Sequence, residues 1–361
     1  MKRVIIIGCG YAGYPLARSL DQYVDVVVVE PRDAFLHNVA AIRAITDPAL
    51  LERIILPYGK LLKRGKVLRD RALAIDGNSI KLASGGSLDG DIIVIATGSG
   101  YARPFKPDSD TLADFVTLNR AAHEQVRAAK SVAIVGAGTV GTELAGEIAV
   151  AMPGKKVTLI SSAPKLFPTY PEGLGRRLQA QLTGMGVTVV TGTVKSLAST
   201  TAPFTGRLEL DTSKAIEADI VFPAIGSKAD GNLTRKMKGA DFDNLGRMKV
   251  DAWLRPAGLA NVFVTGDAVS AGDYMSIVAI LRQQPWLTKT IRAVLAGTKI
   301  EKIPAYAPWP SPPVLVPLGP RKGASVLPVT RKGLVVGPFL TSAIKGKKLF
   351  IPRYHHEFGL S

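Results

Sequence analysis

The same glycine pattern occurs twice in this chain of 361 residues. Residues 6–13 read IIGCGYAG and residues 134–141 read IVGAGTVG, each after a run of β-branched residues. In both places three glycines are spaced G-x-G-x-x-G where a buried strand is expected to pass into a helix. The first glycine permits a tight turn, the second lets a pyrophosphate approach the backbone, and the third lets the helix pack on the strand. We therefore predict an α/β protein with two units, each carrying a phosphate-binding turn.

The strand that follows each turn ends differently in the two units. In the first, VDVVVVE ends at Glu30, where an acid is expected to hold the hydroxyl pair of a ribose. In the second, KVTLIS ends at Ser161, which does not repel the extra phosphate of NADPH. The second unit is thus predicted to accept NADH or NADPH, unless its loop does not touch the ribose. The predicted binding residues of the two turns are Gly8, Gly10, Tyr11, Ala12 and Gly13, and Gly136, Gly138 and Gly141.

Two dinucleotide sites on one chain have a simple chemical use. One holds a flavin permanently, and the other holds a nicotinamide that delivers hydride to it. We expect FAD in the first unit because residues 265–268, TGDA, return late in the chain to complete it. Asp267 is placed there to accept hydrogen bonds from ribityl hydroxyls, although a helix N-cap explains the same residue. The units also end alike, in DIIVIATGS and DIVFPAIGS, which place glycine at Gly98 and Gly226.

Composition excludes several other classes of protein. Hydrophobic residues make up 47% and charged residues 21% of the chain, as in a globular protein. The one cysteine, Cys9, excludes an internal disulfide and a Cys-x-x-Cys redox pair. A formal net charge of +17 favours an anionic partner. We find neither a long apolar run nor a signal segment, so we expect a cytoplasmic protein that can lie on the inner face of a membrane.

The pattern of expected elements divides the chain into three parts. An FAD-binding domain is predicted from residues 1–110 and 245–300, and a NAD(P)H-binding domain from residues 111–244. Residues 301–361 change character, with nine Lys or Arg against two Glu, and predict a basic subdomain of short strands. A helical stretch is expected at 48–65, and a helix at 277–297 that breaks at Gln284 because a proline follows.

The order of these motifs resembles a known family. GxGxxG, Glu, ATG, a second GxGxxG with Glu, and Gly-Asp are similar to the two-dinucleotide-binding flavoprotein reductases. Residues 35–44, FLHNVAAIRA, resemble the apoptosis-inducing-factor-like group that includes ferroptosis suppressor protein, a branch related to type II NADH dehydrogenases. The resemblance implies two Rossmann-like domains plus a small C-terminal α+β subdomain. It also implies FAD-dependent NAD(P)H:quinone oxidoreductase activity at a membrane.

The resemblance also implies roles for individual residues. The first turn, Glu30, Arg43, the backbone at Ala72, Thr97, Gly98 and Asp267 would contact FAD. His37 and Asn38 would lie close to the isoalloxazine, and Glu143 near the nicotinamide. His37 has an ordinary pKa that suits proton delivery to a reduced quinone, although a histidine packed at a loop–helix junction explains it equally well. The expected catalytic residues are His37, Glu143 and Tyr274.

Tyr274 marks a departure from the family. A Lys-Met pair is expected in related proteins where this chain has YMSIVAI, so a neutral tyrosine replaces a cation that would stabilise the anionic reduced flavin. We therefore expect acceptor preference or oxygen reactivity to differ.

Three kinds of partner remain open for the basic surface. A basic tail with paired cations fits an anionic bilayer that dissolves a quinone, but it also fits an ordinary solvated face. An acidic electron carrier such as ferredoxin is the alternative acceptor. Nucleic-acid binding is the least favoured reading, because the sequence has no motif for it beyond positive charge.

Overall fold

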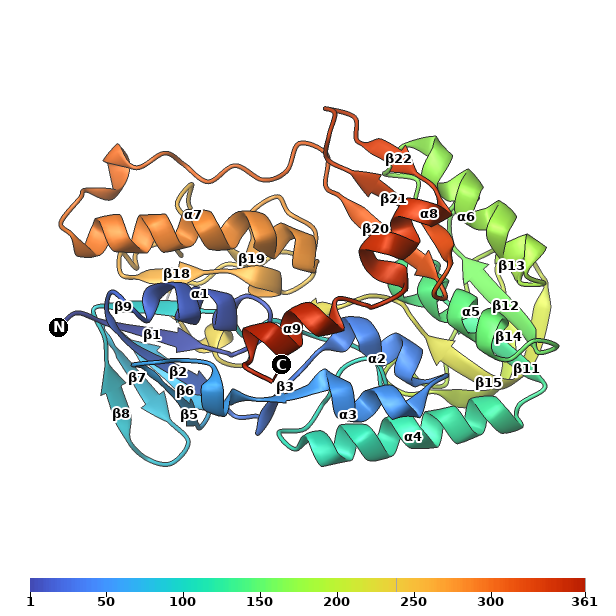
Figure 1. The fold of residues 1–361 in the computed structure, drawn as a ribbon, viewed down its shortest axis with the longest axis horizontal. Helices are drawn as coiled ribbons and strands as arrows, with labels where there is room; N and C mark the ends of the chain where they lie inside the picture. Colours follow the sequence, from blue (N-terminus) through green and yellow to red (C-terminus); the bar gives the residue numbers. More distant parts are fainter. Residues whose placement is uncertain (238, 361) are drawn as a thin grey trace.

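The structure is a computed structural model that describes residues 1–237 and 239–360, and it contains two sheets side by side, one parallel and one mostly parallel (Figure 1). The first sheet has the order β18-β9-β1-β2-β5 and is parallel throughout. Its central strands are buried runs of Ile and Val, as expected for a sheet covered on both faces. The strands are β1 (Arg3–Ile7), β2 (Asp25–Glu30), β5 (Lys66–Arg69), β9 (Ile92–Ile95) and β18 (Val262–Val264).

The second sheet has the order β13-β12-β11-β15-β14. Its first four strands are parallel, and β14 joins the edge in the antiparallel direction. The strands are β11 (Ser131–Val135), β12 (Lys156–Ser161), β13 (Thr188–Thr191), β14 (Phe204–Glu209) and β15 (Ala215–Pro223). Both sheets carry the α/β, Rossmann-like pattern that the repeated glycine turns predicted.

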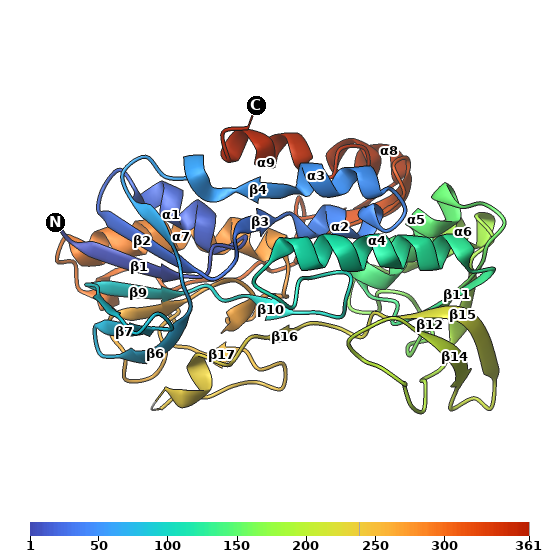
Figure 2. The ribbon, with the colours of Figure 1, turned by 90° about the horizontal axis from the view of Figure 1, so that it is seen from below.

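The chain crosses between the two sheets and then returns to the first. β10 (Ser99–Gly100) pairs with β16 (Lys228–Ala229) between them (Figure 2). After the second sheet the chain supplies β18, which pairs with β9 of the first sheet. The strands of each sheet lie inside the predicted ranges 1–110 with 245–300 and 111–244, and the domain limits themselves stay a prediction.

Helices cover one face of the first sheet and a small meander covers the other. α1 (Gly13–Leu20) packs against α7 (Ile277–Leu295), and the meander is β6 (Ala72–Asp76), β7 (Ser79–Leu82) and β8 (Ser87–Asp89). α4 (Leu112–Ala128), α5 (Thr139–Ala151) and α6 (Glu172–Gly184) belong to the second half. No helix among residues 1–237 and 239–360 has the length and apolar character that a membrane span requires.

The predicted break in the last long helix is wrong, because α7 continues through Pro285. The Gln284 side chain donates to the Ser19 hydroxyl over 2.7 Å and to the Pro15 carbonyl over 3.3 Å, which ties α7 to α1. Leu287 is fully buried on the same face. The free energy gained by packing α7 against α1 therefore outweighs the cost of the backbone hydrogen bond that Pro285 cannot donate.

The stretch 48–65 is helical in its first part and is then interrupted by a strand before a short 3₁₀ turn at Tyr58–Lys60. A 3₁₀ turn (Pro48–Leu50) and α3 (Leu51–Ile54) are followed by β4 (Ile55–Pro57), which pairs with β3 (Ala34–Leu36). The residue before a proline favours extended backbone, and Leu56 precedes Pro57. The prediction of a helical stretch was therefore wrong at Ile55–Pro57, which form a strand, and beyond Lys60, where no helix follows in the described residues 61–65.

The C-terminal part contains the short strands that were predicted, but it does not stay apart from the rest. Its antiparallel sheet packs on α5 and α6, whereas its last helix, α9, packs on the first sheet's side of the molecule (Figure 1). The elements are β20 (Val314–Leu318), β21 (Lys322–Leu327), β22 (Leu334–Val336), α8 (Pro338–Thr341), a π-helical turn (Ser342–Gly346) and α9 (Ile351–Glu357).

The remaining elements are α2, which lies between the two halves, and several shorter ones. They are α2 (Asn38–Ala44), the parallel pair β17 (Met248–Lys249) and β19 (Val269–Ser270), and 3₁₀ turns at Tyr58–Lys60, Thr234–Lys236, Gly266–Ala268 and Ile300–Lys302.

Candidate functional site

The first glycine turn needs glycine at two positions for backbone reasons alone. Gly8 has a φ of +102°, and a Cβ there would lie 2.4 Å from the carbonyl oxygen of Ala96. A Cβ on Gly13 would lie 1.8 Å from the carbonyl oxygen of Gly8, where helix and strand meet. Beside Gly10, in contrast, no described heavy atom other than its chain neighbours lies within 4 Å of an added Cβ. The turn thus leaves open the space that a pyrophosphate needs.

The second glycine turn repeats this geometry. Gly136 has a φ of +108°, and its added Cβ would lie 2.3 Å from the carbonyl oxygen of Ala224. A Cβ on Gly141 would lie 2.0 Å from the carbonyl oxygen of Gly136, and Gly138 again faces open space among the described residues. Each turn therefore has a cradle of the same construction, and both fit a dinucleotide.

The strand that closes each unit ends beside its glycine turn. Gly98 and Gly226 have φ values of +75° and +113° and face open space among the described residues. The Thr97 hydroxyl donates to the Asp230 carbonyl over 3.4 Å, so the end of β9 is held by the segment that follows β16. The sequence echo between ATGS and AIGS thus corresponds to a shared position in the fold.

Glu30 lies where the ribose acid was expected. Its carboxylate is buried and accepts hydrogen bonds from the backbone N–H of Cys9 over 2.7 Å and of Arg32 over 3.0 Å. The Asp70 N–H donates to the Glu30 carbonyl, which brings the β5–β6 connection and buried Ala72 close by. In the second unit, the Ser161 hydroxyl instead donates to the Ala163 carbonyl over 2.7 Å.

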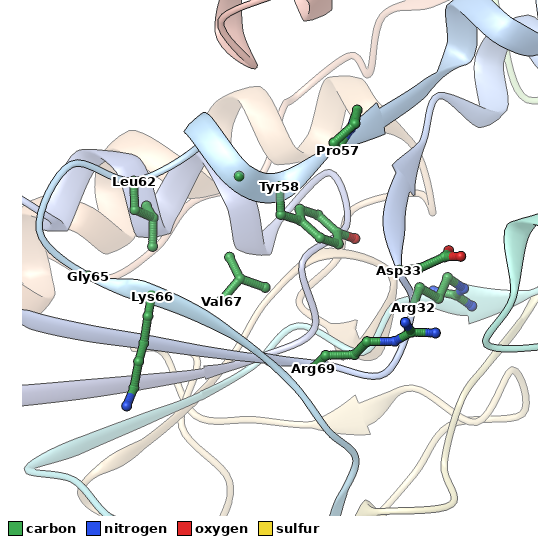
Figure 3. A pocket seen from close by; sticks show the side chains of 10 residues that line it. Arg32, Asp33, Pro57, Tyr58, Leu62, Gly65, Lys66, Val67 and Arg69 are labelled. Atoms are coloured by element: carbon green, nitrogen blue, oxygen red, sulfur yellow. The ribbon is translucent and has the colours of Figure 1, made fainter.

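A hollow of about 470 Å³ opens beside the end of β2 (Figure 3). It is lined by three cationic residues that sequence reasoning missed, Arg32, Lys66 and Arg69, and also by Asp33 and the Tyr58 ring. The Arg32 Nε is buried without a hydrogen-bond partner among the described residues, so this side of the hollow has a donor to offer. The signal that could have found it is a basic residue, Arg32, two positions after the acid that ends the strand.

Asp267 lies beside the end of β9. Its carboxylate accepts from the Ser99 hydroxyl over 2.5 Å and lies 3.4 Å from the Lys106 ammonium. Lys106 also donates to the Ser99 hydroxyl over 2.6 Å. Sequence reasoning missed both Ser99 and Lys106, because neither belongs to a motif. The structure thus places a cation next to Asp267 in a chain that has Tyr274 where a lysine was expected.

His37 is buried, and its hydrogen bonds define its tautomer. Nε2 lies 2.5 Å from the Leu349 carbonyl, which only accepts, so Nε2 carries the proton. Nδ1 therefore accepts from the Tyr11 hydroxyl over 2.7 Å, and that hydroxyl accepts from the Val39 N–H. Burial lowers the pKa of His37 to about 4. The expectation of a neutral-range pKa was wrong, because desolvation disfavours the imidazolium.

Aromatic rings from both ends of the chain surround His37. Its ring lies 4.2 Å from that of Tyr354 between centroids, and Phe35 stacks on Tyr354 and Phe358. The Tyr14 hydroxyl donates to Glu357 at the end of α9. Helix α9 therefore packs against the segment around His37, which was predicted to lie close to the flavin.

Four buried charges join α2, α5 and the C-terminal part. The Arg43 guanidinium donates to the Glu147 carboxylate over 2.8 and 3.0 Å, and the Lys345 ammonium donates to Glu143 over 2.6 Å. Burial raises the pKa of Glu143 to about 7, although Lys345 opposes the rise. Arg43 is thus engaged by a carboxylate of the protein, whereas the Asn38 Oδ1 is buried without a partner among the described residues.

Tyr274 is 48% exposed and does not lie alone. Its ring stacks on that of Tyr170 from the second half, with centroids 5.9 Å apart. Burial, with a contribution from Tyr274, raises the pKa of Tyr170 to about 12. The pair therefore presents neutral aromatic surface where a lysine was expected.

Comparison with known families decides the identity of this arrangement. The pyridine nucleotide-disulphide oxidoreductase family matches residues 2–295. The chain belongs to this family. It is an FAD-dependent oxidoreductase that uses NAD(P)H, in agreement with its two cradles. The family's description mentions a disulphide, but this sequence has one cysteine, Cys9, which cannot form one within the chain and is fully buried in the first turn.

Individual relatives match over nearly the whole chain. Apoptosis-inducing factor homolog B of Dictyostelium discoideum is 30% identical, covering 98% of this chain and 96% of the relative. Ferroptosis suppressor protein 1 of Xenopus tropicalis is 26% identical, covering 99% and 96%. Among solved structures, NDH2 of Plasmodium falciparum in complex with NADH superposes with a TM-score of 0.73 at 13% identity, covering 99% and 97%. The predicted group and the two-dinucleotide-binding fold are confirmed.

Proposed function

We propose that this oxidoreductase passes two electrons from NAD(P)H, by way of FAD, to a quinone. The observation that carries the proposal is the absence of a dithiol, since the sequence has one cysteine and it is buried. Electrons therefore have no relay through a disulfide, and the acceptor has to meet the flavin directly. A quinone accepts two electrons in this way, and similarity to ferroptosis suppressor protein 1 and NDH2 supports this choice.

We assign FAD to the first cradle and NAD(P)H to the second. Gly10, Glu30 and the basic hollow beside it would hold the adenosine diphosphate part of FAD, and Asp267 its ribityl chain. Gly138 and Gly226 would line the NAD(P)H site. When bound, FAD supplies the hydride acceptor and the path of the electrons to the quinone.

Glu143 is the group that we propose holds the proton for quinone reduction. Reduction of a quinone by NAD(P)H consumes one proton beyond the transferred hydride, so the site needs a donor near neutral pH. Glu143 has a pKa of about 7, accepts a hydrogen bond from Lys345, and lies on α5 two residues after the last glycine of the second turn. His37, whose pKa is about 4, would be neutral and would position the aromatic cluster instead.

Matched alanine variants of the two open glycines test the cofactor assignment. An added Cβ at Gly10 or Gly138 meets no described atom beyond its chain neighbours, so both variants should fold. Gly10→Ala should purify with reduced flavin absorbance. Gly138→Ala should keep its flavin but require more NADPH for its reduction. Loss of flavin from Gly138→Ala alone would reverse the assignment.

Stopped-flow measurements test the acceptor. The protein is reduced anaerobically with NADPH or NADH and then mixed with a short-chain quinone while flavin absorbance is followed. Rapid reoxidation supports quinone reduction. The alternative acceptor is an acidic carrier such as ferredoxin, which the net charge of +17 would attract. This alternative is favoured if the quinone leaves the flavin reduced while the carrier reoxidises it, and if the rate of that reoxidation falls sharply at modest salt concentration.

We also propose a cytoplasmic location with attachment to the inner face of a membrane, because a quinone dissolved in lipid would be reached from there. Nucleic-acid binding remains the least favoured alternative. Binding to RNA or DNA that persists without FAD and NAD(P)H would support it instead.

A further inference from the structure

The C-terminal part has a charge pattern unlike the rest of the chain. Between Glu301 and Glu357 the sequence has nine Lys or Arg and no acid. Lys345 pairs with Glu143, and Arg353 pairs with Glu357. The other cations of the segment form no ion pair with any described residue: Lys302, Arg321, Lys322, Arg331, Lys332, Lys347 and Lys348. The C-terminal segment therefore carries a positive charge that acidic residues do not compensate.

Large apolar side chains project from the same part. Phe339 is 82% exposed, and Leu340 and Ile344 nearby are exposed as well. The backbone that carries them is held firmly, because the buried Thr341 hydroxyl bonds to that of Ser325 over 2.8 Å. An exposed phenylalanine on a well-anchored turn is a feature that a soluble surface does not need.

A basic hollow adjoins these apolar side chains. It has a volume of about 660 Å³ and lies between α6 and the start of α8, which neighbour each other in Figure 1. Its lining includes Arg177 from α6, Arg321 from the β20–β21 turn, Lys322 at the start of β21, and Pro338 next to Phe339. Three cations from two separate elements thus converge beside an exposed aromatic ring.

We propose that this face, which we call the docking face (Arg177, Arg321, Lys322, Phe339, Leu340 and Ile344), binds the surface of an anionic phospholipid bilayer. Cations beside a bilayer attract its anionic headgroups, and apolar side chains next to them enter the headgroup–acyl boundary. The cations around the hollow attract the lipid phosphates, and Phe339 is the apolar anchor.

The docking face lies directly behind the candidate proton site. Ile344 is exposed, whereas its neighbour Lys345 is buried and pairs with Glu143. Docking therefore brings the lipid surface to the outer side of the same π-helical turn whose inner side carries the Glu143 partner. The functional role of membrane docking rests on the proposed quinone reduction, whereas the binding of the docking face to a bilayer does not depend on it.

Flotation of the purified, FAD-loaded protein with lipid vesicles tests the proposal. One vesicle is pure phosphatidylcholine, and the other contains about one third phosphatidylserine. Binding is expected to the anionic vesicle only and to weaken with salt. Arg321→Gln/Lys322→Gln should weaken it about 25-fold, at about fivefold per cation. Phe339→Ser should weaken it about tenfold.

A matched control removes the same charge elsewhere. Lys195→Gln/Lys214→Gln lowers the net charge by the same amount at exposed positions of the second half and should leave vesicle binding nearly unchanged. Flavin content and reduction of a soluble quinone should be unchanged in all these variants. A control that weakens binding as much as the docking-face variant would overturn the proposal, as would equal binding to both vesicles or none to either.

Two further outcomes separate this proposal from its rivals. Binding that is insensitive to Phe339→Ser and is abolished by added RNA would identify a nucleic-acid surface and overturn it. Because vesicle flotation needs no electron acceptor, the docking face stands even if the quinone fails to reoxidise the flavin. Conversely, rapid quinone reduction without flotation would leave the proposed function intact and remove the docking face.

Discussion

Replacing His37 by glutamine should change how the stability of the protein depends on pH. In the folded protein His37 is neutral, with Nε2–H bonded to the Leu349 carbonyl and Nδ1 accepting from Tyr11. Glutamine keeps an N–H donor for Leu349 but has no group that titrates, and it leaves the Tyr11 hydroxyl without its acceptor. A lost hydrogen bond of this kind costs about 1–3 kcal/mol at every pH.

The pH-dependent part follows from the lowered pKa. In the unfolded chain His37 takes up a proton below its ordinary pKa of 6.5, whereas in the folded protein it does so only below about 4. The unfolded state therefore binds more protons in this window, and the free energy of unfolding falls as the pH falls. Each pH unit contributes about 1.4 kcal/mol, so about 2 kcal/mol of this dependence should appear between pH 6.5 and pH 5.

Glu143 acts in the opposite direction in the same window. Burial raises its pKa from 4.5 to about 7, so the folded state holds a proton that the unfolded state releases. The contribution of Glu143 to the free energy of unfolding therefore grows as the pH falls from 7 toward 4.5. In the wild type the two groups largely offset each other, and in His37→Gln the Glu143 effect remains alone. We expect the variant to gain stability relative to the wild type on acidification.

Urea unfolding at a series of pH values between 5 and 7, followed by tryptophan fluorescence, measures this effect. His356→Gln is the matched control, because His356 is an exposed histidine on α9 and should leave the wild-type dependence unchanged. Parallel curves for the wild type and His37→Gln would refute the assigned burial and tautomer of His37.

Two further predictions concern contacts made by α5. Lys345→Met removes a cation that lowers the pKa of Glu143. The limb of the pH profile of quinone reduction that lies near neutral pH should therefore move to alkaline pH in Lys345→Met. In Lys345→Arg, which keeps the cation, this limb should stay where it is in the wild type. An unmoved limb would mean that Glu143 does not supply the proton. Gly146→Ala should cost about 1–3 kcal/mol in thermal or urea unfolding, because its Cβ would lie 2.6 Å from the Leu318 Cα; Gly173→Ala, with ordinary contacts, should not. Equal stability of the two variants would contradict the close packing of α5 on β20.

Local sequence patterns predicted the parts of the site that are built locally. Gly8, Gly13 and Glu30 lie within one strand–helix–strand unit, and their spacing indicates the backbone roles of the two glycines and predicts a ribose role for Glu30. The fold class followed from repeating that unit. The two cradles needed no knowledge of the distant chain, because every atom that shapes them is close in sequence or belongs to the next strand of the same sheet.

The misses arose where distant segments meet. No spacing rule links His37 to Leu349 or Glu143 to Lys345, and burial by such distant segments lowers the pKa of His37 and raises that of Glu143. Pro285 was interpreted from its local effect alone, whereas packing of α7 on α1 maintains the helix. Burial and tertiary contact therefore decided the points on which propensity and ordinary pKa values failed.

The fastening of α9 to the first turn has a consequence for protein synthesis. Tyr14 bonds to Glu357, a residue 343 positions later, so the ribosome releases the partner only at the end of translation. β18, too, joins the first sheet only after the whole second sheet has been made. All strands of the second sheet are made before β18, so this sheet can form during elongation, although β20 and β21 cover α5 and α6 only later. The first sheet must wait for β18 and for loop closure over most of the chain. We expect chains stalled before β18 to contain the second sheet and no tightly held flavin.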